Sequence, residues 1–327
     1  MINKRMLGNS GALVSEIGLG TWQLGTKWGD PYNSKEAEKI LRVAYENDIN
    51  FIDTADIYNA GESEKSIGKF MKDTNAKFFV VTKCGRGLNP HTAEMYTPNS
   101  IEKFVDESLK RLQIEKLDMI LLHCPPSSVY KRDDIFSKLD AMKQEGKIFS
   151  YGVSVEKISE AIDAMNYPIS AIEIVFNMFR LKPAEKLFSK SKAQNVGIIA
   201  RVPLASGLLT GKYAKDTVFN KNDHRNFNRN GDVFDKGETF SGVNYELGLQ
   251  AVEELKSLFG TDEIMPYALK WILMHDAVTS VIPGASNAQQ IISNILAASI
   301  PDLTKFQMNE ITKIYDKYIR NDIHHNW

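Results

Sequence analysis

Short apolar runs rich in β-branched residues alternate along this chain with amphipathic segments of helical period. This alternation is typical of consecutive βα units, in which helices cover the outer face of a parallel sheet. The pattern predicts eight strands, at residues 17–20, 50–53, 78–83, 117–123, 149–154, 171–175, 197–201 and 278–283. Because eight parallel βα units close on themselves, the predicted fold class is α/β with a (β/α)8 TIM-barrel architecture.

The segments outside these strands predict how the barrel is completed. The periodic ones indicate helices near 34–48, 62–72, 99–112, 134–145, 156–165, 182–194, 244–258, 264–275 and 287–297. The turn-rich run Gly8-Asn9-Ser10-Gly11 between two short apolar segments predicts an N-terminal β-hairpin that plugs the barrel bottom. Residues 202–243 predict a long, mobile and functional loop after strand seven, and residues 303–318 an extra C-terminal helix. No linker or repeat divides residues 1–327, so we expect a single barrel domain.

Charge and composition exclude several classes of function. Lys and Arg (40) nearly cancel Asp and Glu (41), so no overall field attracts nucleic acid or an anionic membrane. Residues 1–6 lack the apolar core of a signal peptide, no apolar stretch is long enough to span a bilayer, and we expect a cytoplasmic protein. The two cysteines, Cys84 and Cys124, have no CxxC spacing, and the six histidines include no HxH or HExxH pair, so no metal site is predicted.

Two glycine-rich motifs fall short of known nucleotide-binding patterns. In Gly18-Leu-Gly20-Thr-Trp-Gln23, glutamine stands where a dinucleotide fingerprint requires its third glycine, which argues against a Rossmann fold. The run from Gly207 to Lys212 is one residue shorter than a phosphate loop and ends in Tyr213. Its backbone N–H groups remain candidates for contacting a phosphate.

Polar residues close most of the predicted strands, and active sites of such barrels lie at these carboxyl ends. They are Thr21, Asp53, Lys83, His123, Ser154, Glu173 and Arg201. Tyr58 follows Asp53 by five residues. A phenol with an ordinary pKa near 10 needs a neighbouring cation to act as acid or base at neutral pH, which Lys83 can supply while Asp53 orients it. His123 can donate a hydrogen bond to a substrate oxygen.

Each of these residues also has a purely structural interpretation. Asp53 alone is typical of a turn or helix cap, Lys83 of a solvated barrel rim, and His123 of a satisfied core histidine. Together with Tyr58 they occupy one layer of the barrel and carry complementary chemistry. The combination therefore favours a proton-transfer site.

The sequence resembles the aldo-keto reductase superfamily over almost its whole length. The segments that carry the resemblance are Gly18-Leu-Gly-Thr-Trp22, Phe51-Ile-Asp-Thr-Ala-Asp-Ile-Tyr58, Thr82-Lys83, Leu109-Lys-Arg-Leu112, Leu117-Asp-Met-Ile-Leu-Leu-His123, Gly152-Val-Ser154, Pro203-Leu-Ala-Ser-Gly-Leu-Leu-Thr-Gly-Lys212 and Ile282-Pro-Gly-Ala-Ser286, with Gln290 and Asn294. The resemblance implies reduction of an aldehyde or ketone, a small carbonyl substrate, by an NAD(P)H-dependent oxidoreductase. NADP(H) is the expected cofactor, and NAD(H) is the alternative.

The resemblance also implies a role for each site residue. Tyr58 would be the general acid, tuned by Lys83 and Asp53, and His123 would orient the carbonyl beside Trp22 in the substrate pocket. The implied cofactor contacts are Gly20, Thr21, Trp22, Asp53, Ser154, Glu173, Arg201, Pro203, Leu204, Gly207, Leu209, Gly211, Lys212, Gly284, Ser286, Gln290 and Asn294. Ser154 would bind the carboxamide, residues 207–212 would cover the pyrophosphate, and residues 284–294 would surround the adenosine.

Four positions depart from the family pattern. Val155 replaces the Asn that often follows Ser154, Glu173 replaces the usual Gln, Arg201 replaces the ring-stacking Tyr, and Ser286 stands where many NADPH-dependent members carry Arg or Lys. We expect Glu173 and Arg201 to meet beneath the nicotinamide, the alternative being a rim salt bridge without cofactor contact.

Two other functions stay open at this stage. The fold and the tetrad-like residues are shared with voltage-gated potassium channel β subunits, which act as regulatory partners, and the same machinery run in reverse would oxidise a sugar. The sequence does not identify the substrate, and it leaves a homo-oligomer open.

Overall fold

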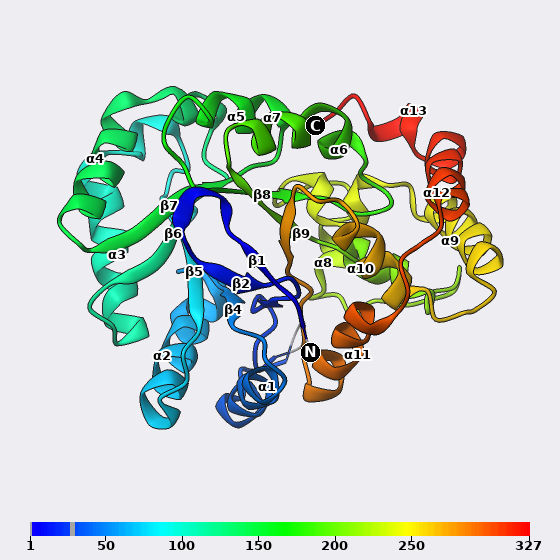
Figure 1. Ribbon diagram of the computed structural model, residues 1–327, viewed down its shortest axis with the longest axis horizontal. Coiled ribbons are helices and arrows are strands. Elements are labelled where there is room, and N and C mark those ends of the chain that lie inside the picture. The colour runs from blue at the N-terminus through cyan, green and yellow to red at the C-terminus, as the bar shows by residue number, and fades with distance from the viewer. Residues whose placement is uncertain (1, 27–29) are drawn as a thin grey trace.

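The computed structural model describes residues 2–26 and 30–327, and its centre is a parallel sheet (Figure 1). The eight strands follow one another in chain order, each hydrogen-bonded to the next. They are β3 (Leu19–Gly20), β4 (Phe51–Asp53), β5 (Phe79–Cys84), β6 (Leu117–His123), β7 (Ile148–Ser154), β8 (Ala171–Val175), β9 (Gly197–Arg201) and β10 (Val278–Val281). This order and direction confirm the predicted (β/α)8 fold.

Backbone hydrogen bonds between the first and last strands close the sheet. The Gly18 N–H donates to the Val281 carbonyl at 2.8 Å, and the Gly20 N–H donates to the Pro283 carbonyl at 3.1 Å. A Cβ atom at Gly20 would lie 2.8 Å from the Ile282 carbonyl oxygen, so glycine permits this close approach. The sheet is thereby joined edge to edge into a barrel.

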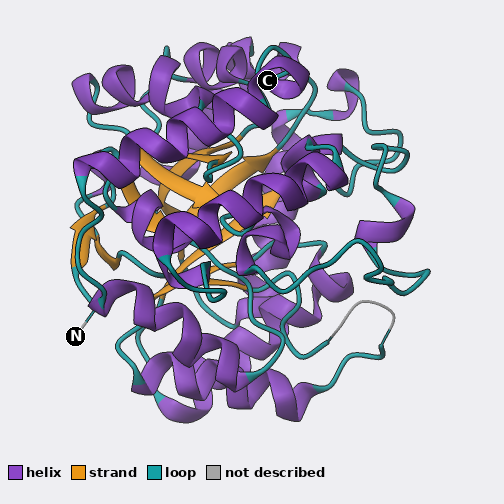
Figure 2. Cartoon of the chain, turned by 90° about the vertical axis from the view of Figure 1, so that its right-hand side faces the viewer, coloured by secondary structure: helices purple, strands orange, loops and turns teal. Residues whose placement is uncertain are grey.

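Helices surround the strands on the outside of the barrel (Figure 2). They are α1 (Ser34–Glu46), α2 (Glu62–Thr74), α3 (Pro98–Leu112), α4 (Asp133–Gln144), α5 (Ile158–Ala164), α6 (Lys182–Lys186), α7 (Phe188–Ala193), α8 (His224–Phe227), α9 (Tyr245–Phe259), α10 (Met265–Leu273), α11 (Ala288–Ser299), α12 (Lys305–Tyr318) and α13 (Arg320–Ile323). Their starts follow local capping chemistry: the Asn33 side chain accepts from two N–H groups of α1, and Thr97 forms a capping box before α3. The extra C-terminal helix is α12.

One predicted helix is divided in two. Residues 182–194 form α6 and α7, which meet at Leu187. Leu187 has a φ of −116°, outside the helical range, and its side chain is fully buried in the core. The break between α6 and α7 therefore allows the Leu187 side chain to be buried in the core.

The N-terminal hairpin covers the end of the barrel where the strands begin. Strands β1 (Lys4–Met6) and β2 (Leu13–Ser15) pair antiparallel, and Leu7 and Val14 pack fully buried among strand side chains such as Met119. Gly8 has a φ of +52°, and a Cβ there would lie 2.2 Å from the Ser170 carbonyl oxygen. The predicted hairpin is present and covers this end, so the carboxyl ends of the strands form the accessible mouth.

The long connection after β9 folds over that mouth in short helical turns. Within it, residues 205–210, 236–238 and 240–242 form 3-10 turns, and α8 lies between the first two. Asn177 after β8 donates to the Val202 carbonyl at 2.8 Å and to the Ser241 hydroxyl at 2.7 Å, which fixes both ends of the connection.

Trp327 packs against the same connection from the far end of the chain. Its indole N–H donates to Asp235 at 3.0 Å, and the Arg180 guanidinium lies 3.6 Å from the centre of its ring. A Cβ at Gly242 would lie 2.4 Å from the indole, so glycine allows this contact. Among residues 2–26 and 30–327, no helix has the length and apolar character needed to cross a membrane.

Candidate active site

A pocket of about 680 Å³ lies at the carboxyl ends of the strands. This volume falls in the range of small-molecule and cofactor sites. Its wall includes Asp53, Tyr58, His123 and Trp22, the residues predicted for catalysis and substrate contact except for Lys83. Lys83 is fully buried behind this wall.

Lys83 connects the predicted acid to its neighbours. Its Nζ donates to the two carboxylate oxygens of Asp53 at 2.6 and 2.7 Å, to the Thr54 carbonyl at 3.0 Å and to the Tyr58 hydroxyl at 3.4 Å. The ring centres of Tyr58 and His123 lie 6.0 Å apart. The structure therefore brings the four predicted catalytic residues into one cluster.

Strand register and one strained turn explain this cluster. Asp53, Lys83 and His123 lie at or next to the ends of the neighbouring strands β4, β5 and β6. Tyr58 comes from the turn after β4, in which Asn59 and Ala60 adopt left-handed φ values of 48° and 53°. Such strain persists where surrounding contacts fix it, and here the Asn59 side chain donates to the Leu24 carbonyl at 3.1 Å.

The electrostatics of the cluster favour a protonated phenol and a neutral imidazole. Burial, together with the Asp53 and Glu173 carboxylates, raises the pKa of Tyr58, although Lys83 opposes the shift. Burial lowers the pKa of Lys83, but the same two carboxylates outweigh it and raise that pKa above its ordinary value. Burial and the Lys83 charge lower the pKa of His123 well below its usual range. Tyr58 thus holds a proton at neutral pH, beside a permanent cation.

Glu173 and Arg201 lie next to this cluster, at β8 and β9. Glu173 lies 3.4 Å from the Lys83 Nζ and accepts from the Ser154 hydroxyl at 3.2 Å. The Arg201 Nε lies 3.8 Å from the same carboxylate. The two residues meet as expected, and both are buried.

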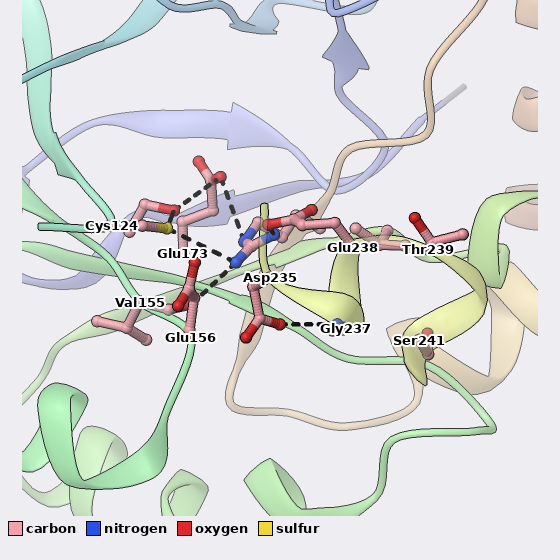
Figure 3. A network of polar contacts seen from close by, with 12 residues as sticks. Cys124, Val155, Glu156, Glu173, Asp235, Gly237, Glu238, Thr239 and Ser241 are labelled. Atoms are coloured by element: carbon pink, nitrogen blue, oxygen red, sulfur yellow. Dashed lines mark hydrogen bonds and ion pairs between the residues drawn. The ribbon is translucent and has the colours of Figure 1, made fainter. Parts of the chain in front are cut away.

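Arg201 has a closer partner that the sequence did not indicate. Its guanidinium pairs with the Glu238 carboxylate and donates to the Val155 carbonyl at 3.0 Å (Figure 3). Glu238 belongs to the connection after β9, whose course no local pattern encodes. The expected two-residue pair is in fact a carboxylate–guanidinium–carboxylate arrangement.

Three buried polar atoms of pocket residues have no hydrogen-bond partner among the residues that the structure describes. They are His123 Nδ1, Glu173 Oε2, whose contact with Lys83 Nζ is an ion pair at 3.4 Å, and Arg201 Nε, whose contact with the Glu173 carboxylate is an ion pair at 3.8 Å. Because a buried polar atom without a partner is costly, these positions suit a ligand that brings both donors and acceptors. A nicotinamide ring with its carboxamide fits this requirement.

Most predicted cofactor contacts line the pocket, and three do not. Those on the wall are Gly20, Thr21, Trp22, Asp53, Ser154, Glu173, Arg201, Pro203, Leu204, Gly207, Lys212, Gly284, Gln290 and Asn294. Leu209 is fully buried in the core instead, and Gly211 faces the Asp262 backbone. Ser286 turns its N–H and hydroxyl to the Gln290 side chain, at 2.8 and 3.3 Å.

Further pocket residues come from segments that the sequence analysis left without roles. His224 and Phe234 approach the Trp22 ring, with centres 5.2 and 6.1 Å away, and form an aromatic wall with it. Arg86 and Cys124, directly after β5 and β6, line the same pocket. The one feature of the sequence that could have indicated Arg86 and Cys124 as pocket residues is their position just after the ends of strands.

The model of the Aldo/keto reductase family matches residues 16–316. The chain belongs to this family. Members carry out NAD(P)H-dependent carbonyl reduction in general, which agrees with the resemblance found in the sequence and does not favour the channel-subunit alternative.

Individual aldo/keto reductases are similar to this chain over almost its whole length. An uncharacterized oxidoreductase, YqkF of Bacillus subtilis, is 30% identical over 99% of this chain and 98% of its own. The aldo-keto reductase yakc [NADP(+)] of Schizosaccharomyces pombe is 28% identical over 94% and 91%. The holo structure of aldo-keto reductase AKR11C1 from Bacillus halodurans superposes with a TM-score of 0.78 at 27% identity, covering 96% of each chain.

Proposed function

We propose that this aldo/keto reductase reduces an aldehyde or ketone to an alcohol with NADPH, and that Tyr58 is the general acid. The observation that carries the proposal is Lys83, whose Nζ contacts both Asp53 and the Tyr58 hydroxyl behind the pocket wall. A phenol beside a fixed cation, facing a pocket next to a neutral imidazole, is equipped to protonate a substrate oxygen.

Different pocket residues would bind different parts of the cofactor. When bound, the nicotinamide supplies the hydride. Ser154, Glu173 and Arg201 would hold its carboxamide end, because their polar atoms converge there. Gly207 and Lys212 would contact the pyrophosphate, and Gly284, Gln290 and Asn294 the adenosine end.

Residues of the chain itself supply the proton that the carbonyl oxygen needs. The Tyr58 hydroxyl donates its proton to the carbonyl oxygen as that oxygen gains negative charge, and the Lys83 ammonium at 3.4 Å stabilises the phenolate left behind. His123, neutral because its pKa is lowered by burial, donates an imidazole N–H to the same oxygen. Trp22 and Phe234 exclude water from the reacting carbon.

Replacing Lys83 by Met should shift the alcohol-oxidation reaction to higher pH. Oxidation requires the Tyr58 phenolate, and without the cation the nearby Asp53 and Glu173 carboxylates disfavour that anion. The pKa of Tyr58 therefore rises, and the pH at which oxidation begins should rise by about 1–3 units. Initial rates of cofactor reduction between pH 7 and 11 measure this shift.

The matched control is Lys65→Met, which removes an exposed lysine of α2. His123→Ala should instead depress carbonyl reduction through lost hydrogen bonding, with little change in the pH at which oxidation begins. A pH–rate profile that is the same in wild type, K83M and H123A would contradict the assigned roles.

The proposed activity itself is tested by a substrate panel. NADPH and NADH oxidation are followed with aromatic aldehydes, methylglyoxal, aldoses and simple ketones. Steady turnover with any of them supports the enzyme. Tight cofactor binding without reduction of any carbonyl would instead support a regulatory role of the channel β-subunit type.

We further propose a modest preference for NADPH that Ser286→Arg strengthens. Gln290 and Asn294 offer hydrogen bonds without charge. Ser286 contacts the Gln290 side chain and not the pocket, whereas the longer side chain of an arginine there would reach the pocket and add a bidentate, charge-assisted contact to a 2′-phosphate. The expected gain is about tenfold in the ratio of kcat/KM values for NADPH and NADH. Ser299→Arg places the same charge at the far end of α11 and serves as control. A wild-type protein that uses NADH better would contradict the preference.

A further inference from the structure

A second cavity of about 450 Å³ adjoins the main pocket. Its lining includes Arg86, Cys124, Ser127, Glu156, Lys157 and Glu160. Arg86 and Cys124 line both spaces. The two cavities therefore share a wall made of these two side chains.

The shared wall lies beside the reacting groups. Cys124 directly follows His123, and its N–H donates to the Ser154 carbonyl at 3.1 Å. Arg86 follows Lys83 by three residues, in the segment after β5. A substrate whose carbonyl meets Tyr58 and His123 therefore shares its pocket with Arg86, a side chain that also lines the second cavity.

The charged side chains that line this cavity differ in how many hydrogen bonds they make within the protein. The Glu160 carboxylate accepts from the Ser127 hydroxyl at 2.7 Å and from the Glu156 and Lys157 N–H groups at 3.0 Å, so its oxygens are satisfied. Arg86 has five N–H donors, and the hydrogen bond that the structure gives it is a long one of 3.4 Å to Glu156. Its side chain is 24% exposed, toward the cavities that it lines.

Glu156 is a weak partner for Arg86. It faces Arg86 and Arg201, but also the carboxylates of Asp235 and Glu238. Burial and these two carboxylates raise the pKa of Glu156 to about 7, although both arginines oppose the shift. Around neutral pH the Glu156 carboxyl is therefore often protonated, and the other carboxylate that acts on Arg86, Glu238, is paired with Arg201.

We propose that the second cavity is a subsite for a carboxylate on the carbonyl substrate, and that Arg86 binds this carboxylate. The inference rests on the proposed function and narrows its substrate class to short oxo acids. A planar guanidinium matches a carboxylate with two parallel N–H···O bonds. A substrate carboxylate would replace the long contact to Glu156 by a closer pair.

The first test compares 4-oxobutanoate with butanal, which has the same chain length and no charge. In wild type, kcat/KM should be at least tenfold higher for 4-oxobutanoate. Arg86→Met should raise KM for 4-oxobutanoate about 10–100-fold and lower the ratio of kcat/KM for 4-oxobutanoate over butanal at least tenfold, because the charge-assisted contact exists only with the acid. Lys131→Met, which removes a nearby exposed cation, is the control for overall charge. Glyceraldehyde 3-phosphate in the same panel separates carboxylate from phosphate recognition. If the wild type had a higher kcat/KM for glyceraldehyde 3-phosphate than for 4-oxobutanoate, the proposal would be overturned.

The second test uses Glu156→Gln, which keeps the shape of the side chain and removes the competing anion. In wild type the advantage of 4-oxobutanoate over butanal should fall as pH rises through about 7, because Glu156 ionises and competes for Arg86. In E156Q the advantage should stay constant from pH 6 to 8.5. A wild-type ratio independent of pH, or E156Q showing the same fall, would contradict the role of Glu156.

A binding measurement separates this inference from the proposed function. Calorimetric titration of the protein–NADP⁺ complex with 4-hydroxybutanoate needs no turnover, and R86M should weaken this binding about tenfold or more. If butanal is reduced but the acid has no advantage and R86M changes nothing, the subsite is wrong and the reductase stands. If no carbonyl is reduced while the acid still binds through Arg86, the subsite stands and the reductase fails.

Discussion

Replacing Tyr58 by Phe should lower the turnover number for carbonyl reduction by about 10²–10⁴, the usual contribution of general acid catalysis. The change removes the proton donor and keeps the aromatic ring, whose centre lies 6.4 Å from Trp22 and 6.0 Å from His123. The pocket should therefore keep its shape, and cofactor affinity should change less than threefold. Single-turnover rates and fluorescence titration with NADPH measure the two quantities separately.

Tyr45→Phe is the matched control, since Tyr45 lies on α1 with 45% of its surface exposed. It removes a hydroxyl group without touching the pocket and should leave both quantities unchanged. Y58F that reduces carbonyls at a near-native rate would remove Tyr58 from the role of general acid. Loss of cofactor binding together with turnover would instead indicate a structural role for the hydroxyl.

Replacing Arg201 by Ala should weaken cofactor binding far more than Glu173→Gln. Arg201 is the cation between the buried Glu173 and the partly exposed Glu238 carboxylates, so its loss leaves Glu238 without its ion pair and Glu173 with Lys83 alone, facing an anionic cofactor. Truncating one partner of a desolvated charge pair typically costs about 2–5 kcal/mol, or roughly 30- to 5000-fold in the dissociation constant. Glu173→Gln keeps an acceptor for Ser154 and removes a charge, so an effect below about tenfold is expected. Titration with NADPH and with NADP⁺ measures both.

A third variant locates the source of the effect. Glu238→Gln removes the closer partner of Arg201 while keeping its size, and it should affect cofactor binding less than R201A because no buried anion is left alone. Equal and negligible effects of R201A and E173Q would mean that the group is a salt bridge without cofactor contact. Thermal unfolding of each variant shows whether a loss of binding reflects a loss of the fold.

The barrel was predictable because its signals are local. Each strand is a short apolar run, and the strands found lie within about two residues of those predicted, as β6 at Leu117–His123 shows. The hairpin followed from the turn chemistry of Gly8 to Gly11. The break at Leu187 was not predictable, because both halves share a helical period and only the packing of Leu187 into the core separates them.

The candidate site was predictable where it depends on strand ends. Asp53, Lys83 and His123 could be placed together because barrel geometry brings the ends of neighbouring strands to one face. Glu238 and Phe234 could not, because they lie in a segment whose course depends on contacts with Asn177 and Trp327, far away in sequence. Ser286 was assigned by resemblance alone, and its hydrogen bonds to Gln290 turn it from the pocket wall.

Because Trp327 contacts both Asp235 and Arg180, we expect two distant parts of the chain to open as one cooperative unit. The 3-10 turn at residues 236–238 carries Glu238 to Arg201, and Trp327 packs directly against that turn and the next. Lifting the turn away from the barrel mouth therefore exposes the indole and breaks its hydrogen bond to Asp235. Native-state hydrogen exchange should report a common opening free energy for residues 236–242 and for α13, well below that of the central strands.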